Sequence, residues 1–504
     1  MSYKIDLSEL DRDSKVSLTQ QLVDRLVTAI EAADLGPGEK LPTTRALATE
    51  AGVNHLTAAR AYRRLAELGY VTATVGRGTF VRSLTPAAGE TGDEWQVYVL
   101  PDRPITYAEQ VLGDAFRLAG EPGMISLSTG HPSAELYPTE ELAQITADVF
   151  RDEGGAAISY ITVEGLWELR EQIAERGRRF GYAREPEEIL VTSGARQSID
   201  LVARELLEPG DVVVVESPSF IGLLSSLRST GARVIGIPVD EHGLDVDALE
   251  QVLARHEVKL LGLQTACQNP TGRDLSPERR QRLAELAIER NFFILEDRVY
   301  ADMRYEGEPV RSIRELAPSH VIYANSLSKT VGGGLRVGWI AAQGPVFERL
   351  AALKLETDFH TATLVQHMAA RFLASGGYDR QIKASVPFYR ERRDALMEAL
   401  ERHLSGEYRA VLPTGGHHVW VTLDRPVNER ELYTEALRHG VTFTPGGVVT
   451  VERPAHTTFR LSFSLLSPEE VDEGVKRLAR AIRELRRRDR LGRAGGARAT
   501  LPVS

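Results

Sequence analysis

The sequence predicts an α/β protein with a small N-terminal unit and a large unit built on a parallel-type sheet with a smaller C-terminal α/β lobe. The apolar runs EILVT, DVVVVE, VKLLGLQT, FFILED and HVIYANS lack polar alternation and are separated by helical stretches. This pattern is typical of parallel strands covered on both faces. Beyond about residue 380, the antiparallel-like runs HHVWVTL and TTFRLSF follow and indicate the smaller lobe.

The composition excludes several classes of protein. The chain is 42% hydrophobic and 26% charged, an ordinary composition for a soluble protein. Its 504 residues are enough for two or three domains, each with its own core. No run approaches the roughly 20 apolar residues of a membrane span, and the first residues lack the apolar stretch of a signal peptide. One cysteine, Cys267, excludes an internal disulfide. We therefore expect a cytoplasmic protein with no membrane partner and no metal site.

The charge is distributed unevenly along the chain. The net charge is −10, yet residues 40–82 contain seven Lys/Arg against two Glu, a local balance of +5. A small basic unit joined to a large acidic one suggests two separate tasks.

The basic unit is expected at residues 15–83. Leucines and an isoleucine four residues apart in SLTQQLVDRLVTAIEAADL predict a first amphipathic helix. TRALATEAGV and NHLTAARAYRRLAELG predict two further helices around a glycine turn, the second capped by Asn54 and ended by Gly69. YVTATVGRGTFVRS predicts a hairpin with a cationic tip at Arg77.

The remaining boundaries follow from shifts in composition. Small, polar and Pro residues at 84–103 predict a linker. The large unit is expected at 104–482, with its smaller lobe from about 380. Residues 483–504 are rich in Arg, Gly and Ala, and we expect them to form a disordered basic tail.

Polar groups follow five of the apolar runs, where parallel strands place their carboxyl ends at one edge of the sheet and ligands bind. They offer an anion-binding turn, an aromatic ring, an amide, a carboxylate with a phenol, and a lysine with an arginine. In chain order these are Ser193 to Gln197, Ser217 to Phe220, Asn269 to Gly272, Asp297 with Tyr300, and Ser328 and Lys329 with Arg336.

One ligand would use all five groups: pyridoxal 5′-phosphate (PLP), a phosphorylated pyridine aldehyde. Lys329 would bind it as a Schiff base. Asp297 would keep the pyridine nitrogen protonated, Asn269 and Tyr300 would hydrogen-bond the ring oxygen, and Phe220 would stack on the ring. The phosphate would be bound by Ser193, Gly194, Ala195, Ser326, Ser328 and Arg336.

Each of these assignments has a simpler alternative. Lys329 could be a solvated charge at a strand end, and Asp297 a cap. Phe220 could be ordinary core packing. Cys267 is close in sequence, but we interpret it as a small core residue. The order of the groups along the chain, rather than any one residue, favours the cofactor.

The large unit resembles the fold-type-I aminotransferases. The matching strings are SGARQSIDLVARELLEPGDVVVVESPSF, QNPTG, EDRVYAD, SLSKTVGGGLRVGW and FRLSF. The resemblance implies that Arg460 binds the α-carboxylate of an amino acid, with a structural ion pair as the alternative. It also implies that Tyr160, in SYITVEGLWELREQIA, reaches the phosphate in a neighbouring subunit. Phe220 stands where tyrosine is frequent, and the histidines of HHVW and DFHTATL have no assigned role.

The small unit resembles the winged helix-turn-helix of the GntR regulators. The shared features are the LPTTRALA lead, the recognition helix of GVNHLTAARAYRRLAELG and the wing GRGTFV. We expect Asn54, His55 and Thr57 near base edges in the major groove. Arg45, Arg60 and Arg77 would contact phosphates, or in the case of Arg77 the minor groove. Alternatively, the arginines of the recognition helix, Arg60, Arg63 and Arg64, form a solvated face.

Together the two units resemble MocR-type (GabR-like) regulators of the GntR family. This implies a homodimer, commonly head-to-tail, that binds double-stranded DNA and senses PLP or an amino-acid or amine effector. The alternative is a catalytically active aminotransferase that carries a DNA-binding unit. The sequence discriminates poorly between them, because every residue needed for transamination is present, but the basic recognition face and the glycine-flanked wing favour the regulator.

Overall fold

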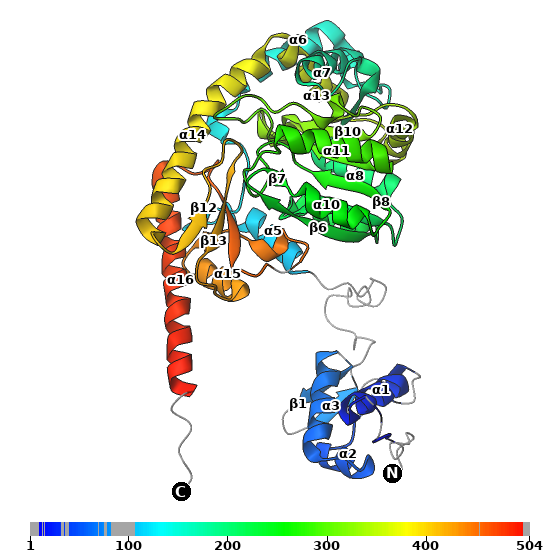
Figure 1. Cartoon of the computed structure of the whole chain (residues 1–504), viewed down its shortest axis with the longest axis vertical. Coiled ribbons are helices and arrows are strands. Elements are labelled where there is room, and N and C mark those ends of the chain that lie inside the picture. The colour runs from blue at the N-terminus through cyan, green and yellow to red at the C-terminus, as the bar shows by residue number, and fades with distance from the viewer. Residues whose placement is uncertain are drawn as a thin grey trace. The chain divides into compact units, whose positions relative to one another are not determined.

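The chain divides into two compact units, Met1–Ile105 and Thr106–Ser504, both drawn in Figure 1. No helix among the described residues is both long and apolar enough to span a bilayer. The computed structural model describes residues 10–12, 14, 16–31, 35, 40–68, 70–74, 78–81, 106–452 and 454–496. The predicted linker, 84–103, lies outside these ranges.

In the first unit, the described residues form three helices and a hairpin. The antiparallel strands pair Val71 with Val81, and the leucines predicted to face inward, Leu22 and Leu26, are buried. The Asn54 side chain accepts a hydrogen bond from the backbone N–H of Leu56 at 2.6 Å, which confirms the predicted cap. The elements are α1 (Leu18–Glu31), α2 (Thr44–Glu50), α3 (His55–Glu67), β1 (Val71–Thr74) and β2 (Gly78–Val81).

The second unit is built on an eight-stranded sheet. Five of its strands run parallel in the order β10-β9-β8-β5-β6. The sheet is not wholly parallel, because β11 lies antiparallel between β4 and β10. In order across the sheet the strands are β4 (Ile189–Thr192), β11 (Gly338–Ala341), β10 (Val321–Ser326), β9 (Phe293–Asp297), β8 (Val258–Leu263), β5 (Val212–Ser217), β6 (Arg233–Asp240) and β7 (Gly243–Leu244).

Helices cover both faces of this sheet, which explains why its strands lack polar alternation (Figure 1). On one face α7, α10, α11 and α13 pack on side chains such as Val191 and Ile294. On the other, α8, α9 and α12 pack on side chains such as Leu190 and Leu295. These helices are α7 (Trp167–Phe180), α8 (Ala195–Leu206), α9 (Ile221–Ser229), α10 (Val246–Leu253), α11 (Pro277–Arg290), α12 (Pro345–Asp358) and α13 (Thr363–Ala374).

The smaller lobe contains a four-stranded sheet, in the order β12-β13-β16-β15, and a separate pair of strands, β14 and β3. Segments from both ends of the unit form its core: Val111 and Leu127 pack with the C-terminal strands and helices. The sequence did not predict that residues 106–127 join this lobe. Its elements are α5 (Tyr107–Leu118), β3 (Ile125–Ser126), α14 (Gly377–Leu404), β12 (Tyr408–Ala410), β13 (His418–Leu423), α15 (Glu429–Arg438), β14 (Val441–Thr442), β15 (Thr444–Pro445), β16 (Thr458–Ser462) and α16 (Pro468–Gly496).

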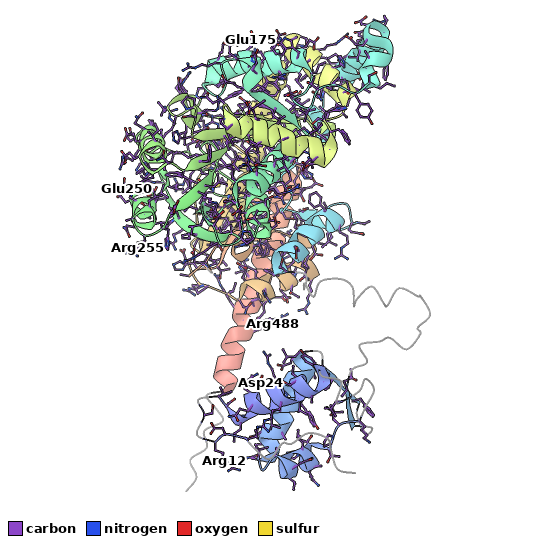
Figure 2. The ribbon with its side chains drawn as sticks, turned by 90° about the vertical axis from the view of Figure 1, so that its right-hand side faces the viewer. Arg12, Asp24, Glu175, Glu250, Arg255 and Arg488 are labelled. Atoms are coloured by element: carbon purple, nitrogen blue, oxygen red, sulfur yellow. The ribbon has the colours of Figure 1, made fainter. Side chains whose placement is uncertain are left out.

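The predicted disordered tail is wrong over residues 483–496, which continue α16 as a helix. Three arginines at the start of this stretch, Arg483, Arg486 and Arg488, have acidic partners on neighbouring elements. Arg486 pairs with Glu407, and Arg488, labelled in Figure 2, bonds to Glu435 at 2.8 Å. Because Leu485 is also buried, the helix is held by tertiary contacts that the local composition does not reveal.

Candidate functional site

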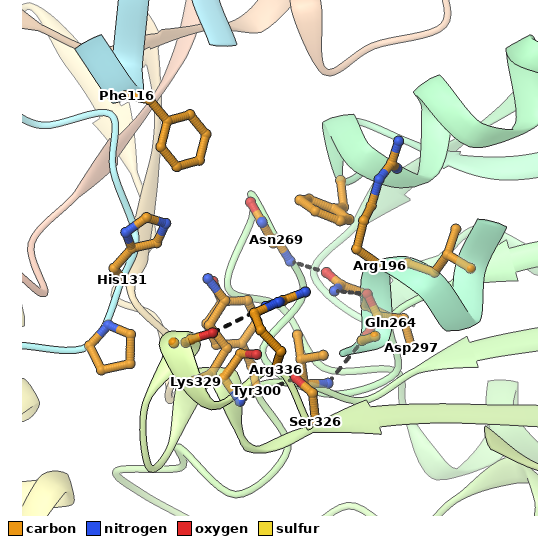
Figure 3. A pocket seen from close by; sticks show the side chains of 18 of the residues that line it. Phe116, His131, Arg196, Gln264, Asn269, Asp297, Tyr300, Ser326, Lys329 and Arg336 are labelled. Atoms are coloured by element: carbon orange, nitrogen blue, oxygen red, sulfur yellow. Dashed lines mark hydrogen bonds between the residues drawn. The ribbon is translucent and has the colours of Figure 1, made fainter. Parts of the chain in front are cut away.

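A cavity of about 430 Å³ lies at the carboxyl edge of the large sheet (Figure 3). All five predicted strand ends contribute to it, because their parallel directions bring these ends to one edge. The predicted residues that line it are Ala195, Phe220, Asn269, Asp297, Tyr300, Ser326, Ser328, Lys329 and Arg336. Ser193, Gly194, Arg460 and Tyr160 do not line it.

Lys329 follows the end of β10, in the turn Leu327–Lys329, with its side chain partly buried. Its Nζ donates a hydrogen bond to the carbonyl of Gly130 at 2.8 Å. Burial, with a smaller contribution from the nearby Arg460, lowers the pKa of Lys329 to about 8, and Asp297 opposes the shift. Near neutral pH a fraction of this lysine is therefore uncharged and nucleophilic.

Asp297 ends β9 and is buried. Its Oδ2 accepts a hydrogen bond from Gln264 Nε2 at 2.7 Å. Burial raises the pKa of Asp297 to about 6, and the Gln264 bond opposes that rise. We did not predict Gln264, although it directly follows β8 and the same strand-end criterion would have found it. Gln264 also accepts from the backbone N–H of Asn269 at 2.7 Å, so one side chain positions two site residues.

The predicted anion-binding turn lies before α8. Gly194 has φ = 96°, and a Cβ at this position would lie 2.7 Å from Arg336 Nη2. The same Nη2 donates to the carbonyl of Ser193 at 2.7 Å, which places the guanidinium at the N-terminus of α8. With Ser326 and Ser328 in the same wall, the turn is suited to a compact anion.

A buried network that the sequence did not predict supports this turn from behind. Gln197 accepts from the backbone N–H of Ser193 at 2.7 Å and donates to Asp358 at 2.7 Å. Lys354, fully buried, donates to Asp358 at 2.7 Å. The charges of Lys354 and Asp358 offset one another, so Lys354 stabilises the turn through Asp358 and Gln197 and has no charge left for a ligand.

Arg460 lies on β16 behind Asn269. Its Nη1 donates to Asn269 Oδ1 at 2.9 Å, and its Nη2 donates to the Ser128 carbonyl at 2.5 Å and to Thr444 Oγ1 at 3.0 Å. No carboxylate pairs with it among the described residues, so the alternative of a structural ion pair has no support there. Burial lowers the pKa of Arg460 to about 10, and its Nε is buried without a partner.

The outer wall of the cavity was not predicted. Figure 3 shows Phe116 and His131 across the cavity from Asn269 and Arg196. The Phe116 ring, on α5, is 62% exposed and lies 5.5 Å from the His131 ring, centroid to centroid. Burial lowers the pKa of His131 to about 4, and Lys329 adds to the shift, so this wall is uncharged at neutral pH.

Tyr160 lies away from the cavity, on the surface. Its side chain is 85% exposed, and its ring contacts those of Phe359 and His360, with centroids 6.4 and 5.5 Å apart. Ile158 and Phe359 are exposed as well. This chain therefore does not bring Tyr160 to its own cavity.

In the first unit the predicted DNA-contacting side chains lie on α2 and at the start of α3. Arg45, Asn54, His55 and Arg60 are exposed and Thr57 is half-buried. Arg77 and the predicted helix end at Gly69 lie outside the described residues. We did not predict Leu56, a large apolar side chain that is 63% exposed beside His55.

The arginines of α3 differ in their partners. Arg64 bonds to Glu67 at 3.1 Å, which is consistent with the solvated-face alternative for that residue. Arg60 has no ion-pair partner in the part of the chain that the structure describes.

Comparisons with known proteins agree with both units. Residues 122–478 match the family described as "Aminotransferase class I and II", and residues 18–81 match "Bacterial regulatory proteins, gntR family". The alpha-aminoadipate aminotransferase LysN of Thermus thermophilus, solved with N-(5′-phosphopyridoxyl)-L-leucine, is 33% identical with a TM-score of 0.69. That match covers 76% of this chain and 99% of LysN.

Two relatives match over both units. The uncharacterized HTH-type transcriptional regulator YisV of Bacillus subtilis is 30% identical over 94% of this chain and 98% of its own length. The probable rhizopine catabolism regulatory protein MocR of Rhizobium meliloti is 26% identical over 94% and 95%. The chain belongs to the aminotransferase class I and II family. With its GntR-type helix-turn-helix, it is a MocR-type GntR regulator with an aminotransferase-like domain.

Proposed function

We propose that this protein is a transcriptional regulator that binds an operator through residues 15–83 and senses PLP or an amino compound through residues 104–482, with 84–103 as the linker. The carrying observation is a cavity lined by Lys329, Asp297 and Arg336 in the same chain as a helix, α3, with exposed polar and cationic side chains. A regulator that acts on chromosomal DNA works in the cytoplasm.

The cofactor of this family is PLP, and the cavity fits it. Lys329 would hold it covalently, Asp297 would face the pyridine nitrogen, and Phe220 would cover one face of the ring. When bound, PLP supplies an electron-accepting ring and an aldehyde carbon that amines attack. The phosphate would be bound by Ala195 at the α8 N-terminus, Ser326, Ser328 and Arg336, which line the cavity, and by the turn of Ser193 and Gly194 that Arg336 holds from beside it.

The side chains act on the effector in separate ways. Lys329, with its lowered pKa, releases or accepts a proton at Nζ when an amine competes for the cofactor. Arg460 would bind the carboxylate of an α-amino acid through the charge that no described carboxylate neutralises. The uncharged wall of Phe116 and His131 would contact the effector's side chain and limit access of water.

We also propose a head-to-tail homodimer. The exposed apolar side chains of Ile158, Tyr160 and Phe359 support it, because exposed apolar side chains are typical of a surface that a partner covers. Phe359 directly follows α12, whose last residue, Asp358, bonds to Gln197 behind the anion-binding turn. In a dimer Tyr160 would reach the partner's phosphate site rather than its own.

The function is tested by measuring DNA binding with the duplex upstream of the protein's own gene as the probe. PLP or an amino acid should change the affinity of the full-length protein for this duplex. Equal affinity with and without PLP and a panel of amino acids would contradict a sensing role.

A second function, amino-acid transamination, is supported by one observation: Lys329 and Asp297 line the cavity, and Arg460 bonds to Asn269, which lines it too. Incubation with PLP, an amino acid and a keto acid, followed for new keto acid, separates the two functions. Sensing requires no turnover, whereas transamination yields product in excess of the protein.

A further inference from the structure

Two adjacent histidines at the start of β13, His417 and His418, have no role in the function proposed so far. His418 is buried, and its two ring nitrogens bond to residues distant in sequence. Nε2 lies 2.9 Å from Tyr300 Oη, and Nδ1 lies 2.8 Å from Ser462 Oγ. His418 and Ser462 are opposite each other in the β13–β16 register, so the small sheet fixes the second contact.

The ring of His418 also packs against the backbone that holds the lysine. A Cβ at Gly130 would lie 2.2 Å from His418 Cε1, so only glycine leaves room for the ring. The carbonyl of Gly130 accepts the hydrogen bond from Lys329 Nζ at 2.8 Å. His418 therefore packs against Gly130, whose carbonyl accepts from Lys329, and also bonds to the Tyr300 hydroxyl.

We assign the protons in this network from the acceptors around it. Ser462 Oγ lies 3.4 Å from the Ser128 carbonyl, which can only accept, so the serine hydroxyl donates there. Ser462 Oγ then accepts from His418 Nδ1–H. A neutral imidazole with its proton on Nδ1 has a lone pair on Nε2, which accepts from the Tyr300 hydroxyl.

The charges around His418 keep the imidazole neutral. Arg460 on β16, Lys329 after β10 and His417 just before β13 surround it, and no carboxylate bonds to it among the described residues. Burial lowers the pKa of His418 well below its usual range, and the cations Arg460 and Lys329 add to the shift, whereas His417 is itself uncharged because burial lowers its pKa to about 3. Asp297 is nearer to Lys329 and Tyr300, and its charge acts on those two groups.

Asn269 has the complementary orientation. Its Oδ1 accepts from Arg460 Nη1 at 2.9 Å, so its Nδ2 hydrogens remain for the cavity. Tyr300, whose single proton is directed at His418, offers the cavity only lone pairs. The two side chains expected to serve the cofactor's ring oxygen therefore differ: Asn269 can donate to it, and Tyr300 cannot while His418 holds its proton.

We propose that His418 is a positioning residue, acting through Tyr300, that directs the tyrosine proton away from the cofactor and leaves Asn269 as the donor to the ring oxygen. This rests on the proposed binding of PLP. A hydrogen bond to the ring oxygen stabilises its negative charge and reduces its attraction for the nearby proton. His418 thereby keeps the pH midpoint of the bound cofactor's visible absorption band high.

The test is a pH titration of that band in the full-length protein loaded with PLP. His418→Phe removes the acceptor and frees the Tyr300 proton for the ring oxygen, so the midpoint should fall by about one pH unit. Tyr300→Phe alone should change the midpoint little, because its proton does not serve the cofactor. The double variant His418→Phe/Tyr300→Phe should return to the midpoint of Tyr300→Phe.

Two further variants separate positioning from packing. His418→Gln retains an acceptor near the position of Nε2, so its midpoint should lie close to that of the wild type. Ser462→Ala keeps the imidazole but removes the acceptor for Nδ1–H, so the proton can move to Nε2 and the midpoint should fall in the same direction as in His418→Phe. Because Ser462→Ala deletes only a hydroxyl, it serves if His418→Phe does not fold.

Three results would overturn the proposal: equal midpoints in His418→Phe and the wild type, equal shifts in His418→Phe and His418→Gln, or a large shift in Tyr300→Phe alone. Absence of any visible band in the wild-type protein would instead contradict the proposed function. The two failures are therefore distinguishable.

Discussion

At the residue scale, burial changes the acid–base behaviour of the side chains that the site needs. Lys329 loses part of its affinity for the proton because its ammonium is desolvated and faces Arg460. Asp297, buried at the end of β9, gains affinity for a proton for the same reason. The first shift makes part of the Lys329 amine uncharged and therefore nucleophilic. The second means that Asp297 is ionised more readily when a positively charged pyridinium lies next to it.

Lys329→Ala should abolish the visible band that survives dialysis, because no other amine lines the cavity among the described residues. Borohydride reduction of the wild-type protein and peptide mass mapping should place the cofactor on the peptide that contains Lys329. The peptide with Lys354, a buried lysine paired with Asp358, is the internal control and should stay unmodified. A retained band in Lys329→Ala would contradict the assignment.

Asp297 makes the stability of the cofactor-free protein depend on pH. Folded, it keeps its proton up to about pH 6; unfolded, it loses it near its ordinary value of 3.8. The folded state binds the extra proton between these values, so stability falls as the pH rises from about 4 to 6.

Asp297→Asn should therefore stabilise the cofactor-free protein at pH 7.5 by about 3 kcal/mol or less and have little effect near pH 4. The asparagine oxygen can still accept from Gln264. Urea unfolding at both pH values, monitored on the second unit, measures the difference. An equal effect at both values would show that the acid's ionisation is not responsible.

At the element scale, helix and strand ends determine where the functional groups lie. The N-terminus of α8 faces the ends of β9 and β10, and the start of α3 presents the exposed polar side chains of the first unit. An arginine with a carboxylate partner has less charge to offer a phosphate than an arginine without one. Among the described residues Arg64 is paired with Glu67 within α3, whereas Arg60 has no such partner.

Arg60→Ala should weaken DNA binding and lower the salt slope of log K by about one, because one phosphate contact and its released counterion are lost. Arg64→Ala is the matched control from the same helix, since Arg64 is already bonded to Glu67. Binding to the upstream duplex at several salt concentrations measures both. Equal losses of DNA affinity in the two variants would contradict a specific phosphate contact by Arg60 and would show that α3 contributes only through its overall charge.

At the scale of the whole molecule, the two units have to communicate, since the effector binds one and DNA the other. The second unit begins with α5, and Phe116 of α5 lines the cavity. Among the described residues, α5 is the first helix that follows the DNA-binding unit in sequence, so an effector in the cavity would contact it. Arg460, from the small lobe, would contact the effector from another side.

Arg460→Gln should weaken the DNA-binding response to α-amino acids at least about tenfold in effector concentration, because the charged bond to the carboxylate is lost. The response to an amine without a carboxylate should change less, which controls for damage to the cofactor site. Gel-shift titrations with both effectors measure the ratio. Equal losses would contradict carboxylate binding by Arg460.

The sequence by itself determined the class of the two units, the strand ends that form the cavity and the residues Lys329, Asp297 and Asn269. These depend on short-range patterns: apolar runs, the polar residues that follow them, and motif order. Only the tertiary structure decided the antiparallel place of β11, the helical continuation of α16 and the contact of His418 with Tyr300. Those contacts join residues far apart in the chain, and their energies come from burial and partners that no local window contains.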